Sequence, residues 1–491
     1  MGMFVLIIPF LTVLLFLTSN TKWVLHTINA TCAVLLLAVS ILITRSVITL
    51  GNISYPLWNS FFYIDSLSII VLDIIMIVSS MVCIYSIGYL NEEYKHNIID
   101  IKRMKIFYML TYAFIFTMVL VVTTRNIGLM WIAIEATTLA SAFLVGFYNN
   151  KNSLEAAWKY IIICSVGISL ALLGIVFLNY SSGNVFHDPG LQLNWTALYQ
   201  NASKLDGGIL KISFIFILVG FGTKVGLVPM HTWLPDAHSQ APSPISAMLS
   251  GVLLNSALYG IIRIIAVVNK NLGSSVYTGR LMIAFGLLSI ATAAVFIIPQ
   301  RDYKRLLAYS SIEHMGIIAL GIGIFTPAAI FGALFHMINH AFTKSMLFLA
   351  SGNVYLKYNT RDTSKVTGLL KTMPYASTAF LLGLFAIAGV PPFSVFSSEL
   401  SIIVSSFDAN HPVLGAVFII LVAIVFAGIA SAMLKMFFGD NKNKDIKKGE
   451  VNIPGIAVII VLLIIISVTG VYMPAKLALL IESASKIIMG V

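Results

Sequence analysis

The chain is a succession of long apolar segments, each of which can cross the hydrocarbon core of a membrane. A helix needs about 20 residues to span about 30 Å of hydrocarbon. Of the 491 residues, 59% are hydrophobic and 10% are charged, which leaves too few polar residues to cover a soluble globule. The sequence therefore predicts an all-α polytopic membrane protein that forms one membrane domain over residues 1–491 in a lipid bilayer. We place about fourteen transmembrane helices near residues 3–19, 30–50, 62–90, 107–123, 126–148, 157–180, 209–229, 240–268, 280–298, 305–325, 327–356, 372–405, 411–438 and 453–474.

Basic residues test this arrangement, because the cytoplasmic connections of membrane proteins are enriched in Lys and Arg. With the N-terminus outside, the inward connections hold more than twice as many Lys and Arg residues as the outward connections and tails. The pattern predicts a multi-pass membrane protein with both termini on the outer side. The net charge of +11 is spread over these short connections, which argues against a nucleic-acid partner.

Residues 219–263 combine charge and proline inside an apolar region. A first apolar helix holds Lys224 and breaks at Pro229, and the segment that follows contains His231 and His238. In hydrocarbon, a broken or charged backbone is tolerated only where it is buried in protein or lines a hydrated cavity. The segment therefore predicts part of an ion path, in which His231 and His238 are secondary candidates.

A second apolar segment is interrupted at Pro391 and Pro392 and is followed by Glu399. Matching broken helices in the two halves of a transporter are typical of inverted repeats that share one translocation path. We expect Glu399 to end this path on the far side.

Glu135 lies within an apolar segment, where a carboxylate costs roughly 2.5–3.5 kcal/mol on insertion scales. Such a residue requires a cationic partner, water or a bound proton. Lys224 is the partner expected across the helix packing, and a movement of Glu135 toward or away from it would switch the lysine between holding and releasing a proton. A purely structural ion pair, or a side chain that extends to the membrane interface, is the alternative.

His336, His340 and Lys344 follow one another at intervals of four residues and therefore share one face of a helix. The histidine pair alone would suit a metal ion. A lysine one turn along the same face opposes a divalent cation, however, and no Glu follows His336 as it does in the zinc motif HExxH. We predict a hydrated relay of titratable groups and no metal site, with a buried hydrogen-bonding role as the alternative.

Other acidic residues and one histidine lie in or beside predicted spans. Glu313 and His314 are adjacent, and we expect one to face the path and the other the helix packing. Asp73 lies deep in a span and fits a structural role as well as a functional one. Asp65 lies near a span end, where it would cap or anchor a helix.

No extramembrane segment is large enough to form a domain of its own. Redox chemistry or nucleotide binding would therefore reside in another chain, and we expect no cofactor in this one. The run GFGTKVG at 220–226 has the wrong spacing for a dinucleotide-binding or phosphate-binding loop.

The run KVGLVPMHTWLPDAHSQAPSPISAMLSG, with the glutamate helix before it and NHAFTKSMLFLASGN after it, resembles the antiporter-like subunits of three kinds of complex. These are respiratory complex I, membrane-bound hydrogenases and Mrp cation/proton antiporters. The resemblance covers nearly the whole chain. Within this family AYSSIEHMGI, INHAFTKS and GVPPFSVFSSE are most similar to the large antiporter-like subunit of hydrogenase 4 and formate hydrogenlyase.

The resemblance implies fourteen helices that contain two inverted five-helix repeats, with helices seven and twelve discontinuous. The repeats would occupy 107–268 (helices four to eight) and 280–438 (helices nine to thirteen), followed by a C-terminal helix and tail at 453–491. Asn255 stands where complex I relatives often carry Lys or His, so the central step would pass through water at Asn255 or through Glu313 and His314. The family's path residues correspond to Glu135, Lys224, His336, His340, Lys344 and Glu399.

For function, the resemblance implies a non-catalytic, proton-translocating subunit of a redox-driven complex. Other membrane and peripheral subunits would be its partners, and they would carry a NiFe site and iron-sulfur clusters. The alternatives are a sodium/proton antiporter subunit of Mrp type, a proton-pumping subunit of NADH-quinone oxidoreductase, and a membrane subunit of an inorganic-carbon uptake system. The sequence leaves open whether the ion is H+ or Na+ and which electron donor and acceptor the complex uses.

Overall fold

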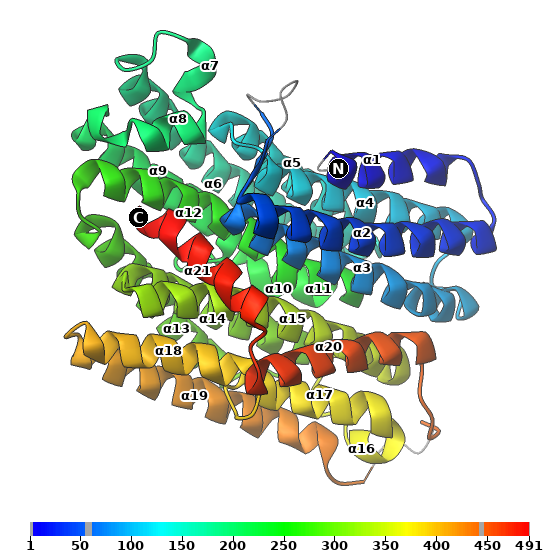
Figure 1. Cartoon of the computed structure of the whole chain (residues 1–491). Coiled ribbons are helices and arrows are strands. Elements are labelled where there is room, and N and C mark those ends of the chain that lie inside the picture. The colour runs from blue at the N-terminus through cyan, green and yellow to red at the C-terminus, as the bar shows by residue number, and fades with distance from the viewer. Residues whose placement is uncertain (1–2, 55–60, 441–445, 491) are drawn as a thin grey trace.

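The computed structural model describes residues 3–54, 61–440 and 446–490 as a bundle of roughly parallel helices. The N-terminal helices form one side of this bundle and the C-terminal helices the opposite side (Figure 1). The elements up to the middle of the chain are α1 (Phe4–Leu17), α2 (Lys22–Leu50), β1 (Ile53–Ser54), β2 (Tyr63–Ile64), α3 (Ser66–Lys95), α4 (Ile101–Thr123), α5 (Ile127–Val145), α6 (Lys151–Gly183), α7 (Pro189–Gln192), α8 (Trp195–Gln200), η2 (Ala202–Lys204), α9 (Gly207–Val225), α10 (Trp233–Gln240), α11 (Ser243–Met248), η3 (Leu249–Leu253) and α12 (Leu254–Leu272). The remaining elements are α13 (Val276–Ile297), α14 (Tyr303–Ile324), α15 (Pro327–Tyr358), α16 (Leu369–Thr372), α17 (Pro374–Ile387), α18 (Ser394–Asp408), α19 (Pro412–Phe437), α20 (Ile453–Val471) and α21 (Ala475–Met489).

The prediction of an all-α polytopic protein is confirmed. In the described ranges, 11 helices are long and apolar enough to cross a membrane. The other predicted spans coincide with α1, with the 32-residue helix α15, and with the pair α17 and α18. The exact count of fourteen stays a prediction. The paired strands β1 and β2 are two residues each and antiparallel.

Both predicted interruptions of the membrane helices are present. Helix α9 ends at Val225 and the chain resumes as α10 at Trp233, while α17 ends at Ile387 and α18 begins at Ser394. Gly226 has a φ of 81°, in the left-handed region that ends a helix and that glycine adopts without strain. The sequence prediction that helices seven and twelve are discontinuous is therefore confirmed.

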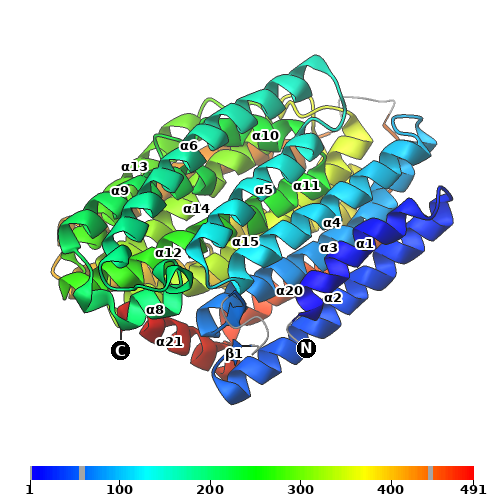
Figure 2. The ribbon, with the colours of Figure 1, turned by 90° about the horizontal axis from the view of Figure 1, so that it is seen from above.

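The centre of the bundle is formed by helices that follow the first break. Nearly all residues from Ser243 to Asn269 and from Tyr303 to Ile324 are buried. In both views α11, α14 and α15 lie between the outer helices (Figures 1 and 2). Residues Leu249–Leu253 form a π-helical turn between α11 and α12, a local widening that is common near functional sites. The polar residues of these helices are consequently shielded from lipid.

A buried ion pair joins α12 to the start of α3. Arg263 donates to both carboxylate oxygens of Asp65, at 2.7 and 2.6 Å, and lies over the ring of Trp195 at 4.2 Å. Burial alone raises the pKa of the Asp65 carboxyl, but the Arg263 guanidinium and hydrogen bonds from Ser68 outweigh burial and hold the pKa below its usual value. Asp65 also caps α3 through Leu67 and Ser68, so its predicted capping role is confirmed. This pair neutralises Arg263 inside α12.

The C-terminal segment differs from the sequence prediction. Residues after 474 were expected to be a tail, yet they form α21, which crosses the bundle obliquely (Figure 1). Its buried residues Leu480, Ile481, Ala484 and Ile488 recur at helical spacing, so one face packs on the protein. The helix therefore packs across the long helices at one end of the bundle.

Candidate functional site

The lysine of the first break lies at the last turn of α9 and is completely buried. The Lys224 ammonium donates to the hydroxyl of Tyr160 on α6 at 2.8 Å and lies 4.8 Å from the centre of that ring. Trp233, the first residue of α10, packs on the same ring at 4.6 Å and donates to the carbonyl oxygen of Thr223. The aromatic pair therefore closes the break around the lysine and supplies it with one polar partner.

Glu135 lies on α5 close to this lysine but is not in contact with it. Its carboxylate accepts hydrogen bonds from Thr138 at 3.0 Å and from Ser165 at 3.0 Å. Within the described chain it forms no direct ion pair with Lys224, and the partnership across the helix packing stays a prediction. Tyr160 occupies the space beside the ammonium.

Hydroxyl groups fill the interval between the two charges. Ser141 lies one turn beyond Thr138 on α5, and its hydroxyl is 2.8 Å from the hydroxyl of Tyr160. Thr138 thus serves Glu135, and Ser141 and Tyr160 serve Lys224, but the Ser141 hydroxyl donates to backbone carbonyls of Thr137 and Thr138, so a water molecule would be needed to join the two groups of hydroxyls. The carboxylate thus acts on the lysine through intervening dipoles.

Lys344 is the buried lysine of the second half, and it lies within the continuous helix α15, away from the second break. Its ammonium donates to the carbonyl oxygen of Leu307 at 2.9 Å and to the hydroxyl of Ser310 at 2.8 Å. Glu313 lies one turn beyond Ser310 on the same helix α14. Lys344 is therefore also held by a hydroxyl, and a carboxylate lies one helical turn from that hydroxyl.

Two histidines continue the line from Glu313. The Nδ1 atom of His314 is 2.9 Å from Nε2 of His336, and Nδ1 of His336 is 2.9 Å from the hydroxyl of Ser398. Because the Ser398 hydroxyl donates to the carbonyl oxygen of Val395, His336 donates to Ser398 through Nδ1 and accepts from His314 through Nε2. The Nε2 atom of His314 then faces the Glu313 carboxylate at 3.9 Å. This order of donors and acceptors allows a proton to move along both rings.

Glu399 ends the line at the second break. Its carboxylate lies 3.9 Å from His314 Nδ1 and packs against Gly389, where a Cβ atom would collide with it. Gly389 has a φ of 67°, so the turn requires a glycine for both reasons. The break thereby holds the carboxylate against the histidine pair.

His340 and His238 are buried histidines without hydrogen-bond partners for either ring nitrogen within the described chain. The ring of His340 lies 5.6 Å from that of His314, and the ring of His238 stacks on Phe348 of α15 at 5.1 Å. Unpartnered buried polar atoms are costly unless water or a transferable proton satisfies them. Both histidines therefore have ring nitrogens available to the line.

Asn255 lies at the start of α12, directly after the π-helical turn. Its amide donates to the carbonyl oxygen of Gly251 at 2.8 Å and approaches that of Met337 at 3.5 Å, while its Oδ1 atom is buried without a partner in the described chain. The place of Asn255 between the two halves agrees with the expected central position. Its free oxygen suits a water molecule.

Two of the predicted candidates lie apart from this line. Asp73 accepts from Ser40 at 2.5 Å and from Thr44 at 2.7 and 2.8 Å, so it joins α3 to α2. His231 lies in the first break and is 9% exposed, with Nδ1 unpartnered within the described residues. Asp73 therefore joins two packed helices, and His231 lies at the edge of the site.

A metal ion has one geometrically suitable group of ligands in the described chain. Ligand atoms of His314, His336 and Glu399 lie within 4.8 Å of one another. Two imidazoles and a carboxylate are a donor set that zinc accepts. The two rings are hydrogen-bonded to each other, however, and the lysine on the same helix would repel a divalent cation. The absence of a metal site stays a prediction.

Sequence reasoning did not identify the hydroxyls that connect the charged residues. Tyr160, Ser141, Ser310 and Ser398 each make a connecting hydrogen bond. Serine in a membrane helix can also bond its own backbone, so its presence carries no functional signal. Tyr160 had one usable signal, since a buried tyrosine requires a partner for its hydroxyl.

Two broken helices and a buried line of titratable side chains define this chain as an antiporter-like, polytopic membrane protein. The family described as NADH:quinone oxidoreductase/Mrp antiporter matches residues 124–427, and the family described as the N-terminus of complex I chain 5 matches residues 58–97. The chain belongs to the NADH:quinone oxidoreductase/Mrp antiporter family.

Its relatives include subunits of hydrogenases and of complex I. It is 38% identical to the hydrogenase-4 component F homolog of Methylacidiphilum infernorum over 419 residues, which are 85% of this chain and 87% of that protein. It is 31% identical to hydrogenase-4 component B of Escherichia coli over 346 residues, 68% of this chain and 49% of that protein. It is 30% identical to NADH-quinone oxidoreductase subunit M of Rickettsia conorii over 330 residues, 66% of this chain and 64% of that protein.

Solved structures share the fold over nearly the whole chain. The archaeal membrane-bound sulfane sulfur reductase matches with a TM-score of 0.87 at 23% identity, over 99% of this chain and 97% of that one. The Mrp complex from Dietzia sp. DQ12-45-1b matches with a TM-score of 0.87 at 19% identity, over the same shares. These structures are multi-subunit membrane complexes, and the predicted family and fold are confirmed.

Proposed function

We propose that this chain is a proton-translocating, non-catalytic membrane subunit of a complex I-related energy-converting complex. A group 4 membrane-bound hydrogenase, such as a formate hydrogenlyase, fits best. The observation that carries the proposal is the buried line from Lys344 through Glu313, His314 and His336 to Glu399. Homology to hydrogenase-4 subunits supports the type of complex. The redox groups, a NiFe site and iron-sulfur clusters, would reside in partner subunits.

The proton is taken up in the first half and released from the second. When Glu135 is charged, its field favours a protonated Lys224; when it is neutralised, burial favours loss of the lysine's proton. The proton then crosses by way of Lys344, His340 and His336. Water at Asn255, or the pair Glu313 and His314, would provide the central step.

Release occurs at Glu399, on the opposite side of the membrane from uptake. This direction follows from two inverted repeats, at 107–268 and 280–438, each of which contributes one break to the shared path. The C-terminal helix and tail at 453–491 lie outside both repeats. The chain would reside in a prokaryotic plasma membrane with its termini on the outer side.

A sodium/proton antiporter subunit of Mrp type is the second candidate. The fold shared with an Mrp complex and the family match both favour it. The two candidates differ in the ion, since a line of imidazoles and lysines carries protons, whereas Na+ binding needs several oxygen ligands. The imidazoles in the second half therefore favour the proton.

Glu135→Gln and Lys224→Ala test the proposal in vesicles that contain the whole complex. We expect either change to abolish proton pumping while the complex still assembles, because each removes a charged group and leaves the apolar packing between the helices unchanged. Glu155→Gln is the matched control, since Glu155 is an exposed glutamate on α6 that pairs with Lys159. Wild-type pumping in both variants would refute the proposed role.

A further inference from the structure

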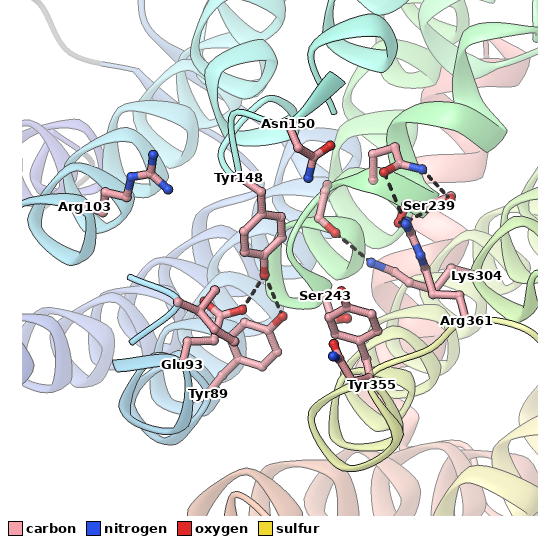
Figure 3. Close-up of a pocket in the computed structure, with 14 residues that line it drawn as sticks. Tyr89, Glu93, Arg103, Tyr148, Asn150, Ser239, Ser243, Lys304, Tyr355 and Arg361 are labelled. Carbon is pink, nitrogen blue, oxygen red and sulfur yellow. Dashed lines mark hydrogen bonds between the residues drawn. The ribbon is translucent and has the colours of Figure 1, made fainter. Parts of the chain in front are cut away.

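A polar cavity opens at the end of the bundle where the connections 96–100 and 299–302 lie (Figure 3). Its volume is about 350 Å³, and its lining comes from α3, α10, α14 and α15 and from the connections between them. At roughly 30 Å³ per water molecule, it has room for about ten waters. The cavity can therefore hold a connected group of water molecules on the predicted inner side.

A buried carboxylate lines this cavity. Glu93 is 1% exposed and accepts a hydrogen bond from the hydroxyl of Tyr148, which in turn is 2.9 Å from the hydroxyl of Tyr89 (Figure 3). Its second oxygen, Oε2, has no partner in the described chain. A buried carboxylate with a vacant oxygen needs water or a bound proton, and the cavity supplies access to both.

The cations of the cavity hold the end of α10. Lys304 is 3% exposed and donates to the carbonyl oxygen of Ala241 at 2.6 Å, and Arg361 donates to the carbonyl oxygen of Ser239. Figure 3 shows both side chains directed at this segment. In the described chain Lys304 forms no ion pair with Glu93. The cations therefore fix the wall of the cavity and leave the carboxylate unpaired, and that carboxylate would oppose a bound anion.

The wall that they fix carries a buried histidine on its inner side. Ser239, Gln240 and Ala241 line the cavity, and the preceding residue is His238, whose two ring nitrogens are unpartnered within the described chain. His238 interacts electrostatically with both Lys304, at the cavity, and Lys344, in the buried line. It stacks on Phe348, one turn beyond Lys344 on α15. His238 is thus placed between the cavity and the line.

We propose that this cavity is a second proton-uptake site, in which Glu93 takes a proton from water and His238 passes it toward Lys344. The inference rests on the proposed function and adds an uptake site to it. Each step moves one proton and no electrons: hydronium from the cavity protonates the Glu93 carboxylate and becomes water, the carboxylic acid passes its proton through water to the His238 ring and becomes a carboxylate again, and the ring passes the proton toward Lys344. This site supplies the second half, while the charge change at Glu135 and Lys224 is still required for proton release at Glu399.

Glu93→Gln in the reconstituted complex tests this site. We expect proton uptake per electron to fall severalfold and Glu93→Asp to recover part of it. Glu92→Gln is the control, because Glu92 lies one residue away, pairs with the exposed Lys95 and does not line the cavity. In Glu93→Ala, added acetate should restore part of the uptake, since the cavity admits a small weak acid; the same acetate should not change the control.

Two results would overturn the inference. The first is wild-type proton uptake in Glu93→Gln. The second is equal loss in Glu93→Gln and Glu93→Asp with no effect of acetate on Glu93→Ala, which would indicate a packing role. The proposed function fails separately, through wild-type pumping in Glu135→Gln and Lys224→Ala.

Discussion

The two halves of the buried line connect lysine and glutamate with different chemical groups. In the first half, hydroxyls stand between Lys224 and Glu135, with Tyr160 in contact with the ammonium. In the second half, the imidazoles of His314 and His336 stand between the lysine and Glu399. Both halves keep their lysine out of direct contact with a carboxylate.

The two kinds of connecting group differ in whether they can only pass a proton on or can also hold one. A hydroxyl transfers a proton only while it receives another, whereas an imidazole can hold an extra proton near neutral pH. The buried pair of Asp65 and Arg263 provides the contrast, because direct bidentate contact keeps both groups permanently charged. Under the proposed function, the indirect connections leave the path lysines able to change charge, and the second half would be the part that stores protons.

Glu399→Gln should produce the largest effect and tests the storage role of the second half. Without a titratable terminus, protons held by the imidazoles cannot leave, and we expect pumping to fall roughly 100-fold, as for loss of an acid–base group. Coupled redox turnover should slow as well, because charges interact strongly at low dielectric. Glu399→Asp should retain part of both activities.

The measurement is proton uptake and electron transfer in the same proteoliposomes. Asp408→Asn, at the exposed end of the same helix, is the control and should behave as wild type. Glu399→Gln could stop pumping while redox turnover continues at the full uncoupled rate. That result would keep Glu399 as the exit of the path but would refute the electrostatic coupling.

Tyr160→Phe should produce a smaller effect and tests the conducting role of the hydroxyls. The change keeps the ring beside Trp233 but removes the acceptor of the Lys224 ammonium. A hydrogen bond to a charged group contributes about 1.5–3 kcal/mol, so we expect the pumping rate to fall about ten- to a hundredfold. Single-turnover proton uptake would measure this rate. Tyr180→Phe, on the exposed face of α6, is the control. A wild-type rate in Tyr160→Phe would show that the hydroxyls are not part of the proton path.

Zinc analysis of the purified complex should show the smallest effect. We expect no zinc bound by this chain, because His314 and His336 bond to each other and lie near Lys344. Elemental analysis of wild type, His336→Ala and His340→Ala checks this, with the exposed His187→Ala as control. If the wild type holds one zinc per chain and His336→Ala or His340→Ala loses it, these histidines form a metal site and the relay is refuted.

The charged members of the line could be predicted from the sequence, and their connections could not. Glu135, Lys224 and Glu399 are conspicuous because charge is rare and costly in apolar segments. Tyr160 and Ser310 resemble ordinary helix residues until the packing brings them beside a lysine. For Asp73 the sequence left a structural and a functional role equally open, and its bonds to Ser40 and Thr44 join two helices.

Residues at helix ends were misinterpreted for a related reason. By sequence, Lys304 and Glu93 lie near the ends of spans, where charged residues usually reach the aqueous phase. Both are buried in the structure and line one cavity. A charge near the end of a span indicates topology in most membrane proteins, so only the fold separates a snorkelling residue from a buried one.

By itself the sequence determined that the chain crosses a membrane, where its helices lie and where two of them break. These properties depend on local composition, because hydrocarbon requires apolar side chains and an internally bonded backbone over each span. The tertiary structure decided which polar groups meet: Arg263 with Asp65, Lys224 with Tyr160, and His314 with His336. Such contacts depend on the rotation and depth of helices far apart in the chain, which packing sets and hydropathy does not.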